Sequence, residues 1–522
     1  MDAIAFEHHL TSPQGHHRLP VDAFTAIVNG GACCDQVALS LSVDGERVTD
    51  AGFEAHGCGA ATAAGSAAVT LVRDRSVLDA ARTGAAEIAA ELGGLSPGKL
   101  HAAEVAADAL ARALGAAVRA RSLVPAPGGP GPRTLVAMSG GVDSAVAALM
   151  CARGGETVAV TLELWADAEN DAERSCCSAS AVAQARALAL SMGLPHFTID
   201  LRDEFSAGVV EPFIASFAAG ETPNPCVGCN GHVRLDAMLE LAGRLGCDRL
   251  ATGHYARVAE RDHRAGPLLR VAADPAKDQT YMLAALAPDS LARMRFPLGE
   301  LTKPEVREIA AAAGLPVAGK VDSQDLCFLA GTDRARFLAR HGELGDAAGA
   351  IVDGEGNVIG RHHGQHRFTV GQRRGIGIAA GEPLYVVDKD AARNEVIVGP
   401  LTALQTARVH VRRARLHRAG DRVNRVKLRY HARPLACRLV GAGVGAGGAG
   451  GAAGPGPGRH TALELELSEP VDGAAPGQLA CLMDGELVVG WGTIARPARP
   501  PQERYRTLKS ALRTSDSAYA GQ

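Results

Sequence analysis

The stretch Ala137-Met138-Ser139-Gly140-Gly141-Val142-Asp143-Ser144 decides the fold of the largest part of this chain. The apolar run Thr134–Met138 leads into it and predicts a buried strand, and Val142–Arg153 predicts a helix. Two adjacent glycines let backbone N–H groups close around an anion, and the helix start adds free N–H groups and a positive dipole end. Its two serines supply hydroxyl donors, and its aspartate can act through a cation. The stretch therefore predicts a phosphate-binding turn between a strand and a helix.

This loop lacks the lysine of a Walker-type phosphate loop. An ordinary glycine-rich turn is the alternative. The pattern Ser-Gly-Gly-x-Asp-Ser at 139–144 resembles the pyrophosphate loop of the ATP-pyrophosphatase (PP-loop) superfamily, whose members split ATP between its α and β phosphates and adenylate a substrate. The resemblance implies that the loop binds ATP, with Mg²⁺ on the phosphates.

Strands and helices alternate after the loop, which predicts a parallel sheet covered by helices, with ligands at the carboxyl ends of its strands. Gly253-His254-Tyr255 follows one such strand, and Leu162 ends another, where it either flanks adenine or packs in the core. The predicted strands are Thr157–Leu162, His196–Leu201 and Arg249–Thr252, and the predicted helices are Ser178–Met192 and His232–Leu245.

Residues 1–121 predict a separate α+β domain. An alternating run at Val37–Val43, the turn Asp44-Gly45 and a return strand at Val48–His56 form a hairpin. Alanine-rich helices follow at Ala60–Val72, Ser76–Ala90 and Leu100–Ala120. Residues 122–133 contain four prolines and three glycines, a composition typical of an interdomain linker.

This first domain carries candidate metal ligands at Cys33, Asp35, Cys58 and His101, which suit iron or zinc. By spacing alone, incidental buried cysteines explain them as well. The segments Gly31–Asp35, Gly57–Gly59 and Lys99–His101 resemble the ligand segments of the NifU/IscU-type iron–sulfur cluster assembly scaffold. In two departures from that family, Cys34 replaces a glycine and Ala102 stands where a cysteine is expected, so a degenerate scaffold, a zinc site and a docking module all stay open.

Further cysteines lie in the second domain, predicted to span residues 134–335. The loop Glu221–Asn230 has two prolines and a glycine, which predict irregular structure, and it carries Cys226 and Cys229 as a C-x-x-C pair. Alone, that pair fits a redox couple, half of a zinc site or cluster ligands. Lys277–Tyr281 is either a contact to phosphate and a base edge or a solvated turn, and Cys327 lies beside an aromatic residue.

The remainder predicts two more domains and a tail. Residues 336–402 would be a small central domain, with a basic patch at Gly364–Arg374 suited to a phosphate backbone. Residues 403–497 predict a β-barrel with a flexible Gly/Ala-rich insertion at 440–458, and residues 498–522 predict a disordered tail. The predicted barrel strands are Ala407–Arg413, Arg425–Tyr430, Ala462–Leu467, Gln478–Met483 and Leu487–Ile494.

The composition limits the classes of function. The 522 residues include 54 basic and 57 acidic side chains, so a nucleic-acid surface must be a local patch. No apolar run predicts a membrane span and no signal peptide is expected. Twelve cysteines are too sparse for a secreted disulfide scaffold, which favours a cytoplasmic location.

Seven motifs in order resemble the tRNA-specific 2-thiouridylase family over about residues 134–496. With the other domains, the resemblance implies a multidomain fold: an α+β scaffold-like domain, an α/β PP-loop domain with a parallel sheet, a small central domain and a β-barrel. The motifs are Ser-Gly-Gly-Val-Asp-Ser (139–144), Cys-Cys-Ser (176–178), Thr-Pro-Asn-Pro (222–225) with Cys-Asn (229–230), Ala-Thr-Gly-His-Tyr (251–255), Lys-Asp-Gln-Thr-Tyr (277–281), Asp-Ser-Gln-Asp-Leu-Cys-Phe (322–328) and Thr-Val-Gly-Gln-Arg-Arg-Gly (369–375).

The family resemblance implies ATP-dependent replacement of the C2 oxygen of the tRNA wobble uridine by sulfur, through an adenylated uridine. Cys327 matches the persulfide-carrying cysteine, and Cys229 the thiol that releases the sulfur and forms a disulfide with it. A sulfur donor such as a cysteine desulfurase or a sulfur relay protein is implied as partner. The implied ATP ligands are Ala137, Met138, Ser139, Gly140, Gly141, Val142, Asp143, Ser144, Leu162 and Gly253, and the implied tRNA contacts are Asn224, Pro225, Cys226, His254, Lys277, Asp278, Gln279, Arg429, Tyr430 and Gln478.

One departure from that family concerns the chemistry, because many members have Asp where this chain has Cys226. Cys226, Cys229 and Cys327 together could ligate a 4Fe–4S cluster that delivers sulfide, so cluster, persulfide and a structural role for Cys226 stay open. Two other functions remain as alternatives: a different PP-loop enzyme, and an iron–sulfur scaffold or carrier with an accessory ATP-binding domain.

Overall fold

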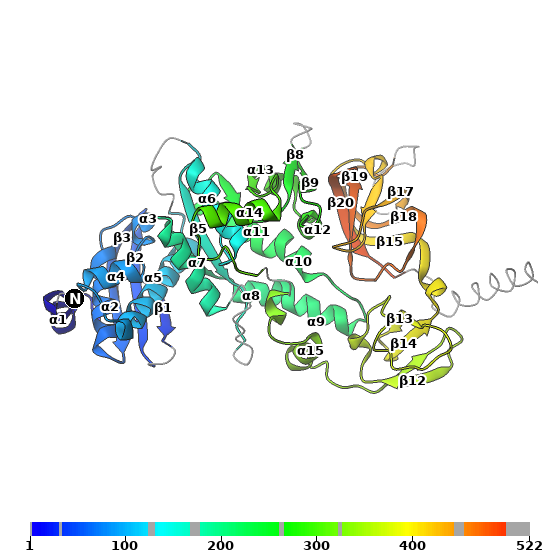
Figure 1. The fold of residues 1–522 in the computed structure, drawn as a ribbon, viewed down its shortest axis with the longest axis horizontal. Helices are drawn as coiled ribbons and strands as arrows, with labels where there is room; N and C mark the ends of the chain where they lie inside the picture. Colours follow the sequence, from blue (N-terminus) through cyan, green and yellow to red (C-terminus); the bar gives the residue numbers. More distant parts are fainter. Residues whose placement is uncertain are drawn as a thin grey trace, which may run out of the picture.

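The computed structural model describes residues 3–30, 34–123, 131–167, 178–259, 266–321, 326–442 and 454–496. Four units follow one another along the chain, with the N-terminal unit at one end of the molecule and the barrel at the other (Figure 1). The 440–458 insertion lies partly, and the 498–522 tail wholly, outside the described residues.

The N-terminal unit is a three-stranded antiparallel sheet covered by helices, as the sequence predicts for an α+β domain. The predicted hairpin pairs β2 with β3, and Gly45 in its turn adopts a φ of +54°. The sequence did not predict α1 or β1, and the helix predicted at 76–90 is broken into two. The elements are α1 (Ala3–Thr11), β1 (Phe24–Asn29), β2 (Gln36–Asp44), β3 (Arg47–His56), α2 (Gly59–Val72), α3 (Val77–Ala80), α4 (Ala85–Glu91), a 3-10 turn η1 (Pro97–Lys99) and α5 (Leu100–Ala120).

The second unit contains a five-stranded sheet in the order β10-β7-β4-β5-β6, and every pairing in it is parallel. The predicted parallel sheet is confirmed. Its first elements are β4 (Thr134–Ala137), α6 (Val142–Gly154), β5 (Thr157–Glu163), α7 (Ala179–Ser191), β6 (His196–Asp200), α8 (Arg202–Phe205), a π-helix η2 (Ser206–Val210), α9 (Glu211–Ala218), α10 (Pro225–Gly228), a second π-helix η3 (Cys229–Arg234), α11 (Leu235–Arg244) and β7 (Arg249–Ala251).

The second unit continues with a hairpin that leaves the parallel sheet and joins the barrel sheet, where β9 pairs with β20. The chain then returns to the parallel sheet through β10. These elements are β8 (Arg257–Ala259), β9 (Leu268–Arg270), α12 (Thr280–Leu283), α13 (Pro288–Arg293), β10 (Met294–Arg295), α14 (Lys303–Ala312), a 3-10 turn η4 (Cys327–Leu329) and α15 (Arg334–Gly342).

A four-stranded sheet and a closed barrel complete the molecule. The central sheet has the order β12-β11-β14-β13, and pairing of β15 with β20 closes six strands into the predicted barrel. Strand β17 covers residues where the sequence predicted no strand. The elements are β11 (Gly349–Val352), β12 (Val358–His362), η5 (Gln365–Arg367), β13 (Tyr385–Asp390), β14 (Glu395–Gly399), η6 (Leu401–Leu404), β15 (Gln405–Leu416), η7 (Gly420–Arg422), β16 (Arg425–Lys427), β17 (Leu435–Ala442), β18 (Gly458–Asp472), β19 (Leu479–Asp484) and β20 (Leu487–Ile494).

Candidate functional site

The predicted phosphate loop joins β4 to the start of α6. Gly140 adopts a φ of +68°, a conformation that favours glycine, so the backbone can turn sharply before the helix. Ser144 Oγ accepts the Ser139 N–H at 3.1 Å and donates to the Gly141 carbonyl at 3.1 Å. These bonds fix the loop in shape ahead of the helix N-terminus, where an anion is favoured.

The loop lies at the point where the sheet changes its direction of winding. The chain proceeds from β4 to β5 and β6 on one side, and β7 and β10 lie on the other side of β4. Such a switch point is where parallel sheets bind ligands. Gly253 follows β7, and a Cβ atom there would lie only 2.7 Å from the Ser144 nitrogen, so glycine allows this close approach. Leu162, in β5, is buried in the apolar core.

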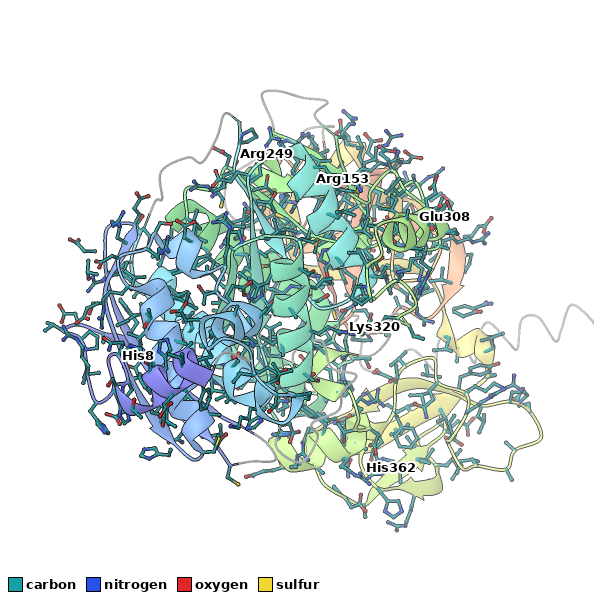
Figure 2. All side chains as sticks on the ribbon, turned by 60° about the vertical axis from the view of Figure 1, so that its left-hand side comes forward. His8, Arg153, Arg249, Glu308, Lys320 and His362 are labelled. Carbon is teal, nitrogen blue, oxygen red and sulfur yellow. The ribbon has the colours of Figure 1, made fainter. Side chains whose placement is uncertain are left out.

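Two lysines that sequence reasoning missed reach the loop from distant segments. Lys303, the first residue of α14, is buried, and its Nζ donates to both carboxylate oxygens of Asp143 at 2.8 and 2.9 Å. The Tyr255 hydroxyl donates to the same carboxylate at 2.9 Å. Lys320 Nζ donates to the Gly140 carbonyl at 3.0 Å, near the middle of the molecule in Figure 2. Positive charge therefore stands at this loop although the loop itself has none.

The C-x-x-C pair lies on helical turns, and the prediction of an irregular loop there is wrong. Asn224 Oδ1 accepts the Cys226 N–H at 3.2 Å and caps α10, and Pro225 occupies the first helical position, where its missing N–H costs nothing. Cys226 is half-buried in α10, and Cys229, which opens η3, is buried. The turn places the two thiols on one short helical segment.

Cys327 belongs to a segment that packs on the neighbouring helices α8 and α9. The ring of its neighbour Phe328 contacts the rings of Phe205 and Phe213, with centroids 5.9 and 5.1 Å apart. The π-helix η2 joins the helices that carry these two rings, and η2 packs tightly on η3, because a Cβ atom at Gly208 would lie 2.6 Å from Val233 Cγ2. The Cys327 and Cys229 segments thus both pack on the helical layer formed by α8, η2 and α9, and both cysteines belong to one continuous apolar cluster. The adjoining motif residues 322–325, like Cys176 and Cys177, lie outside the described residues.

His254, beyond β7, is half-buried and neutral. Desolvation of its ring and, to a smaller extent, the charge of nearby Arg234 together lower its pKa to about 3. Because Arg234 Nη2 can only donate, His254 Nε2 accepts that bond at 3.3 Å, and its Nδ1 therefore donates to Thr252 Oγ1 at 2.8 Å. The bonds to Arg234 and Thr252 fix one tautomer of the imidazole beside the carboxyl ends of the strands.

The segment 277–281 connects the sheet to the barrel. Asp278 is buried and accepts hydrogen bonds from Thr280 Oγ1 at 2.8 Å and Lys427 Nζ at 3.4 Å. Gln279 Oε1 accepts the Tyr255 N–H at 2.9 Å. Burial raises the pKa of Tyr430, Asp278 and Cys226 raise it further, and a hydrogen bond with Gln279 lowers it. Cys226, Gln279 and Tyr430 therefore stand close together where the second unit meets the barrel.

The structure also brings together three of the predicted ligands in the N-terminal unit. Asp35 Oδ1 accepts the Cys58 N–H at 2.8 Å, and its Oδ2 lies 3.3 Å from Cys58 Sγ and 2.9 Å from His101 Nε2. Burial alone would raise the pKa of Asp35, but these hydrogen bonds hold it below its ordinary value. Ala102 is buried and supplies no thiol, and Cys33 lies outside the described residues. A carboxylate, a thiol and an imidazole thus converge in a set that suits zinc or iron.

Comparison with known proteins gives three family matches. Residues 132–331 match the tRNA methyl transferase HUP domain, residues 335–400 the tRNA methyl transferase PRC-barrel domain, and residues 7–121 the NifU-like N terminal domain. A bifunctional protein NifU/MnmA of Rubrobacter xylanophilus is 43% identical over 503 residues, which cover 94% of this chain and 97% of that protein.

The chain belongs to the tRNA-specific 2-thiouridylase family. Members named tRNA-specific 2-thiouridylase MnmA in Zymomonas mobilis and Chloroflexus aggregans are 41% and 43% identical, over 69% and 70% of this chain and 93% and 98% of their own lengths. The resemblance of residues 134–496 to this family and of the N-terminal unit to NifU-type scaffolds is confirmed. Among the described residues, no helix has the length and apolarity needed to cross a membrane.

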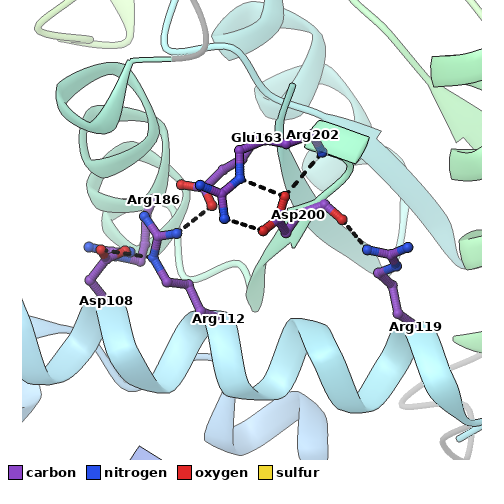
Figure 3. Close-up of polar contacts among 7 residues, drawn as sticks. All are labelled: Asp108, Arg112, Arg119, Glu163, Arg186, Asp200 and Arg202. Carbon is purple, nitrogen blue, oxygen red and sulfur yellow. Dashed lines mark hydrogen bonds and ion pairs between the residues drawn. The ribbon is translucent and has the colours of Figure 1, made fainter. Parts of the chain in front are cut away.

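In this 2-thiouridylase the NifU-like unit is docked by helix α5 on the second unit, which carries the PP-loop and is called the PP-loop unit below (Figure 3). Arg112 contacts Asp108 at 3.0 Å and pairs with Glu163, at the end of β5. Asp108 also pairs with Arg186. Burial raises the pKa of Glu163, and the charge of Arg112 opposes that rise. A Cβ atom at Gly115 would lie 1.9 Å from the carbonyl of Thr198 in β6, so glycine lets α5 lie directly on the edge strand.

The predicted basic patch of the 2-thiouridylase at 364–374 is divided between core and surface. His366 is buried, and Arg367 pairs with Asp346, while Arg373 and Arg374 are exposed. Arg367 is exposed as well, but its charge is already paired, so Arg373 and Arg374 are the arginines of this patch best suited to a phosphate backbone.

Proposed function

We propose that this chain uses ATP to replace the C2 oxygen of the tRNA wobble uridine by sulfur, as a tRNA-uridine 2-sulfurtransferase. One observation carries the proposal: a PP-loop at the switch point of a parallel sheet shares a domain with two cysteine segments packed on one helical layer. Membership in the 2-thiouridylase family supports it. A carbonyl oxygen is a poor leaving group, so adenylation is the step that ATP must supply.

In this proposal the ATP site consists of residues 137–144, Gly253 and Leu162. Lys303 and Lys320 supply the positive charge that a Walker lysine supplies elsewhere. In the structure Lys303 pairs with Asp143. When ATP binds, the Lys303 ammonium would contact the phosphates instead, and the Asp143 carboxylate would be free to bind Mg²⁺. Mg²⁺ is usually bound by one or two carboxylates together with substrate phosphates, and the loop supplies one carboxylate, that of Asp143.

The sulfur chemistry involves Cys327 and Cys229. The outer sulfur of a Cys327 persulfide attacks C2, and AMP leaves with the former carbonyl oxygen. The Cys229 thiolate then attacks Sγ of Cys327 and breaks its bond to the transferred sulfur, which leaves a Cys229–Cys327 disulfide. An external dithiol reduces that disulfide, and a cysteine desulfurase or relay protein reloads Cys327.

The proposed reaction also requires residues that contact the tRNA. Asn224, Pro225 and Cys226 at the start of α10 and the neutral His254 meet the uridine, which must leave its stack. Tyr430 offers an aromatic face beside Cys226. The remaining proposed contacts are Lys277, Asp278, Gln279, Arg429 and Gln478, of which Asp278 is buried and would act by holding its neighbours.

A second candidate for sulfur delivery rests on Cys226. Three thiols from two packed segments fit the donor set of a 4Fe–4S cluster, since Cys226 lies one helical turn before Cys229. Cys226, Cys229 and Cys327 would hold it, and a fourth, open iron would supply a place for sulfide. The chain's own part is unchanged: the PP-loop adenylates, and His254 and Asn224 hold the base.

The NifU-like unit fits two roles. Asp35, Cys58 and His101 offer a three-ligand site for zinc or iron, and the α5 interface makes the unit a fixed part of the enzyme. An iron–sulfur carrier with an accessory ATP domain is the competing function for the whole chain.

The deciding experiment is mass spectrometry of tRNA nucleosides from a 2-thiouridylase deletion strain rescued with this chain. We expect 2-thiouridine to return, and to be lost with Cys327→Ala. Absence of 2-thiouridine in the wild-type rescue would reject the function and favour the carrier. Anaerobic purification of wild type and Cys226→Asp with iron and sulfide assays then separates the two sulfur routes, because a metal-free, fully active wild type rules out the cluster.

A further inference from the structure

A pocket of about 550 Å³ opens where three units of the chain meet. Thr222 lines it from the second unit, Thr369–Gln372 from the central unit, and Arg429 and Gln478 from the barrel, while Arg334 stands at the start of α15. Gln478 Nε2 donates to the Thr222 carbonyl at 2.7 Å, and a Cβ atom at Gly477 would lie 3.1 Å from the Thr222 nitrogen. The barrel therefore closes directly on the segment that precedes Asn224, so the pocket is preformed.

Arg334 is half-buried, and no carboxylate in the described part of the chain acts on its guanidinium. Its guanidinium lies 5.0 Å from the ring centre of Phe217, and Nη2 donates to the Arg367 carbonyl at 3.1 Å. Burial lowers its pKa, and no described charge compensates. An arginine held in this way has donors left over for an anion.

The surroundings increase the positive potential of this pocket. Arg429 is exposed, and its only described hydrogen bond is a weak one from Nη2 to the Gly473 carbonyl at 3.5 Å. Lys389 lies close enough to Arg334 and Arg496 for their charges to act on it. Burial, followed by these two charges, lowers the pKa of Lys389 to about 7. Asp388 and Glu221 act on Lys389 in the opposite direction, and Glu221 is itself paired with Arg412 at 2.7 Å. Among the described residues that line the pocket, Arg334 and Arg429 are cationic and none is acidic.

The pocket is better suited to a phosphate than to a stacked base. Within the described residues no aromatic side chain lines it, so it offers no stacking platform. Arginine donors and glycine backbone suit a phosphate group, which carries no sequence information. The pocket also adjoins the thiolation site, because Thr222 precedes the cap of α10 by two residues and Arg429 precedes Tyr430 by one.

We propose that this junction pocket binds one phosphodiester of the single-stranded anticodon segment of tRNA, with Arg334 and Arg429 as its cationic ligands. The proposal rests on the proposed function and specifies where the strand beside the flipped uridine is held. Because three units contribute to the pocket, a bound phosphate also fixes the barrel and the central unit against the catalytic unit.

The test measures binding of an unmodified tRNA transcript to the full chain at several salt concentrations. We expect Arg334→Gln to weaken binding about tenfold and to make the slope of log K against log[salt] shallower by about 0.7, the value for one phosphate on a single strand. ATP binding should be unchanged. Arg336→Gln, an exposed arginine on the same helix, is the matched control and should show neither change.

A second measurement locates the phosphate and keeps the proposal testable if Arg334→Gln unfolds. Arg429 is exposed, so Arg429→Gln should fold and show the same reduction in slope. An anticodon stem-loop with one neutral methylphosphonate beside the uridine should bind wild type as weakly as the unmodified stem-loop binds the variants. The modified stem-loop should bind the variants no more weakly than the unmodified one does. Wild-type salt slopes in both variants would overturn the pocket proposal, whereas failure of wild type to bind or thiolate tRNA would overturn the proposed function itself.

Discussion

Replacing Lys303 by methionine tests whether this lysine, which reaches the loop from the start of α14, does the work of the Walker lysine that the loop lacks. Lys303 Nζ lies 2.8 and 2.9 Å from the two Asp143 oxygens, and the side chains of Lys303 and Asp143 are only 10% and 30% exposed. A hydrogen bond to a charged group contributes about 1.5–3 kcal/mol, which corresponds to about 10- to 100-fold in a rate or binding constant. We therefore expect Lys303→Met to lower kcat/KM for ATP by about 10- to 100-fold.

The assay is tRNA-dependent release of pyrophosphate at varied ATP, with kcat and KM determined separately. A contact to the ATP phosphates in the ground state raises KM, and a contact formed only in the transition state lowers kcat. Lys99→Met is the matched control, because Lys99 is an exposed lysine of the NifU-like unit, 4.8 Å from the centre of the Phe6 ring. Its thermal unfolding and pyrophosphate release should match wild type.

A double substitution separates phosphate binding from simple neutralisation of Asp143. If Lys303 serves only to neutralise that carboxylate, the Asp143→Asn, Lys303→Met double variant should have the same kcat/KM for ATP as the Asp143→Asn single variant. If Lys303 binds phosphate, the double variant should be no better than Lys303→Met. Wild-type kcat/KM in Lys303→Met would refute the reasoning outright.

Three further outcomes follow from the structure. Cys327→Ala should abolish 2-thiouridine in nucleoside mass spectrometry while pyrophosphate release persists, because in the proposed mechanism adenylation precedes sulfur delivery. Arg112→Met, which leaves the mostly buried Glu163 unpaired, should cost about 3 kcal/mol in denaturant unfolding, against less than about 1 kcal/mol for the exposed Arg202→Met. Burial lowers the pKa of His196 to about 3, so the folded state resists a proton that the unfolded state accepts below about pH 6.5. The contribution of neutral His196 to the free energy of unfolding is complete above that pH and should be lost at about 1.4 kcal/mol per pH unit as pH falls toward 3. In denaturation series at several pH values, His196→Gln should remove this slope.

The parts of the fold that sequence predicts are those whose cause is local. The loop at 139–144 lies between an apolar run and a helix, and both elements form as expected. Ser178 caps its helix by accepting the Ala181 N–H at 3.2 Å, as a serine before an alanine-rich run predicts. The carboxylate, thiol and imidazole of the N-terminal unit also converge as its family resemblance implied.

The parts that sequence missed depend on contacts between distant residues or on two signals in conflict. Lys303 and Lys320 reach the loop across 160 and 180 residues, which no spacing rule covers. Around Asn224 two prolines favoured a loop, but proline at the first helical position and a capping asparagine start a helix instead. Strand β17 ends in small residues typical of a linker, and its pairing with β16 and β18 decides its structure.

Helix α5 limits how the two halves of the chain can cooperate. His101 lies in its first turn, and Arg112 and Gly115 pin its middle to the ends of β5 and β6. At 1.5 Å per residue, His101 stands about 16 Å along the helix from Arg112. Through His101, the Asp35–Cys58–His101 cluster is tied to a helix that can leave the PP-loop unit only by breaking the Arg112–Glu163 ion pair. Delivery of cargo from that cluster to Cys327 by movement of the NifU-like unit would therefore cost this ion pair, whereas a separate carrier would leave it intact.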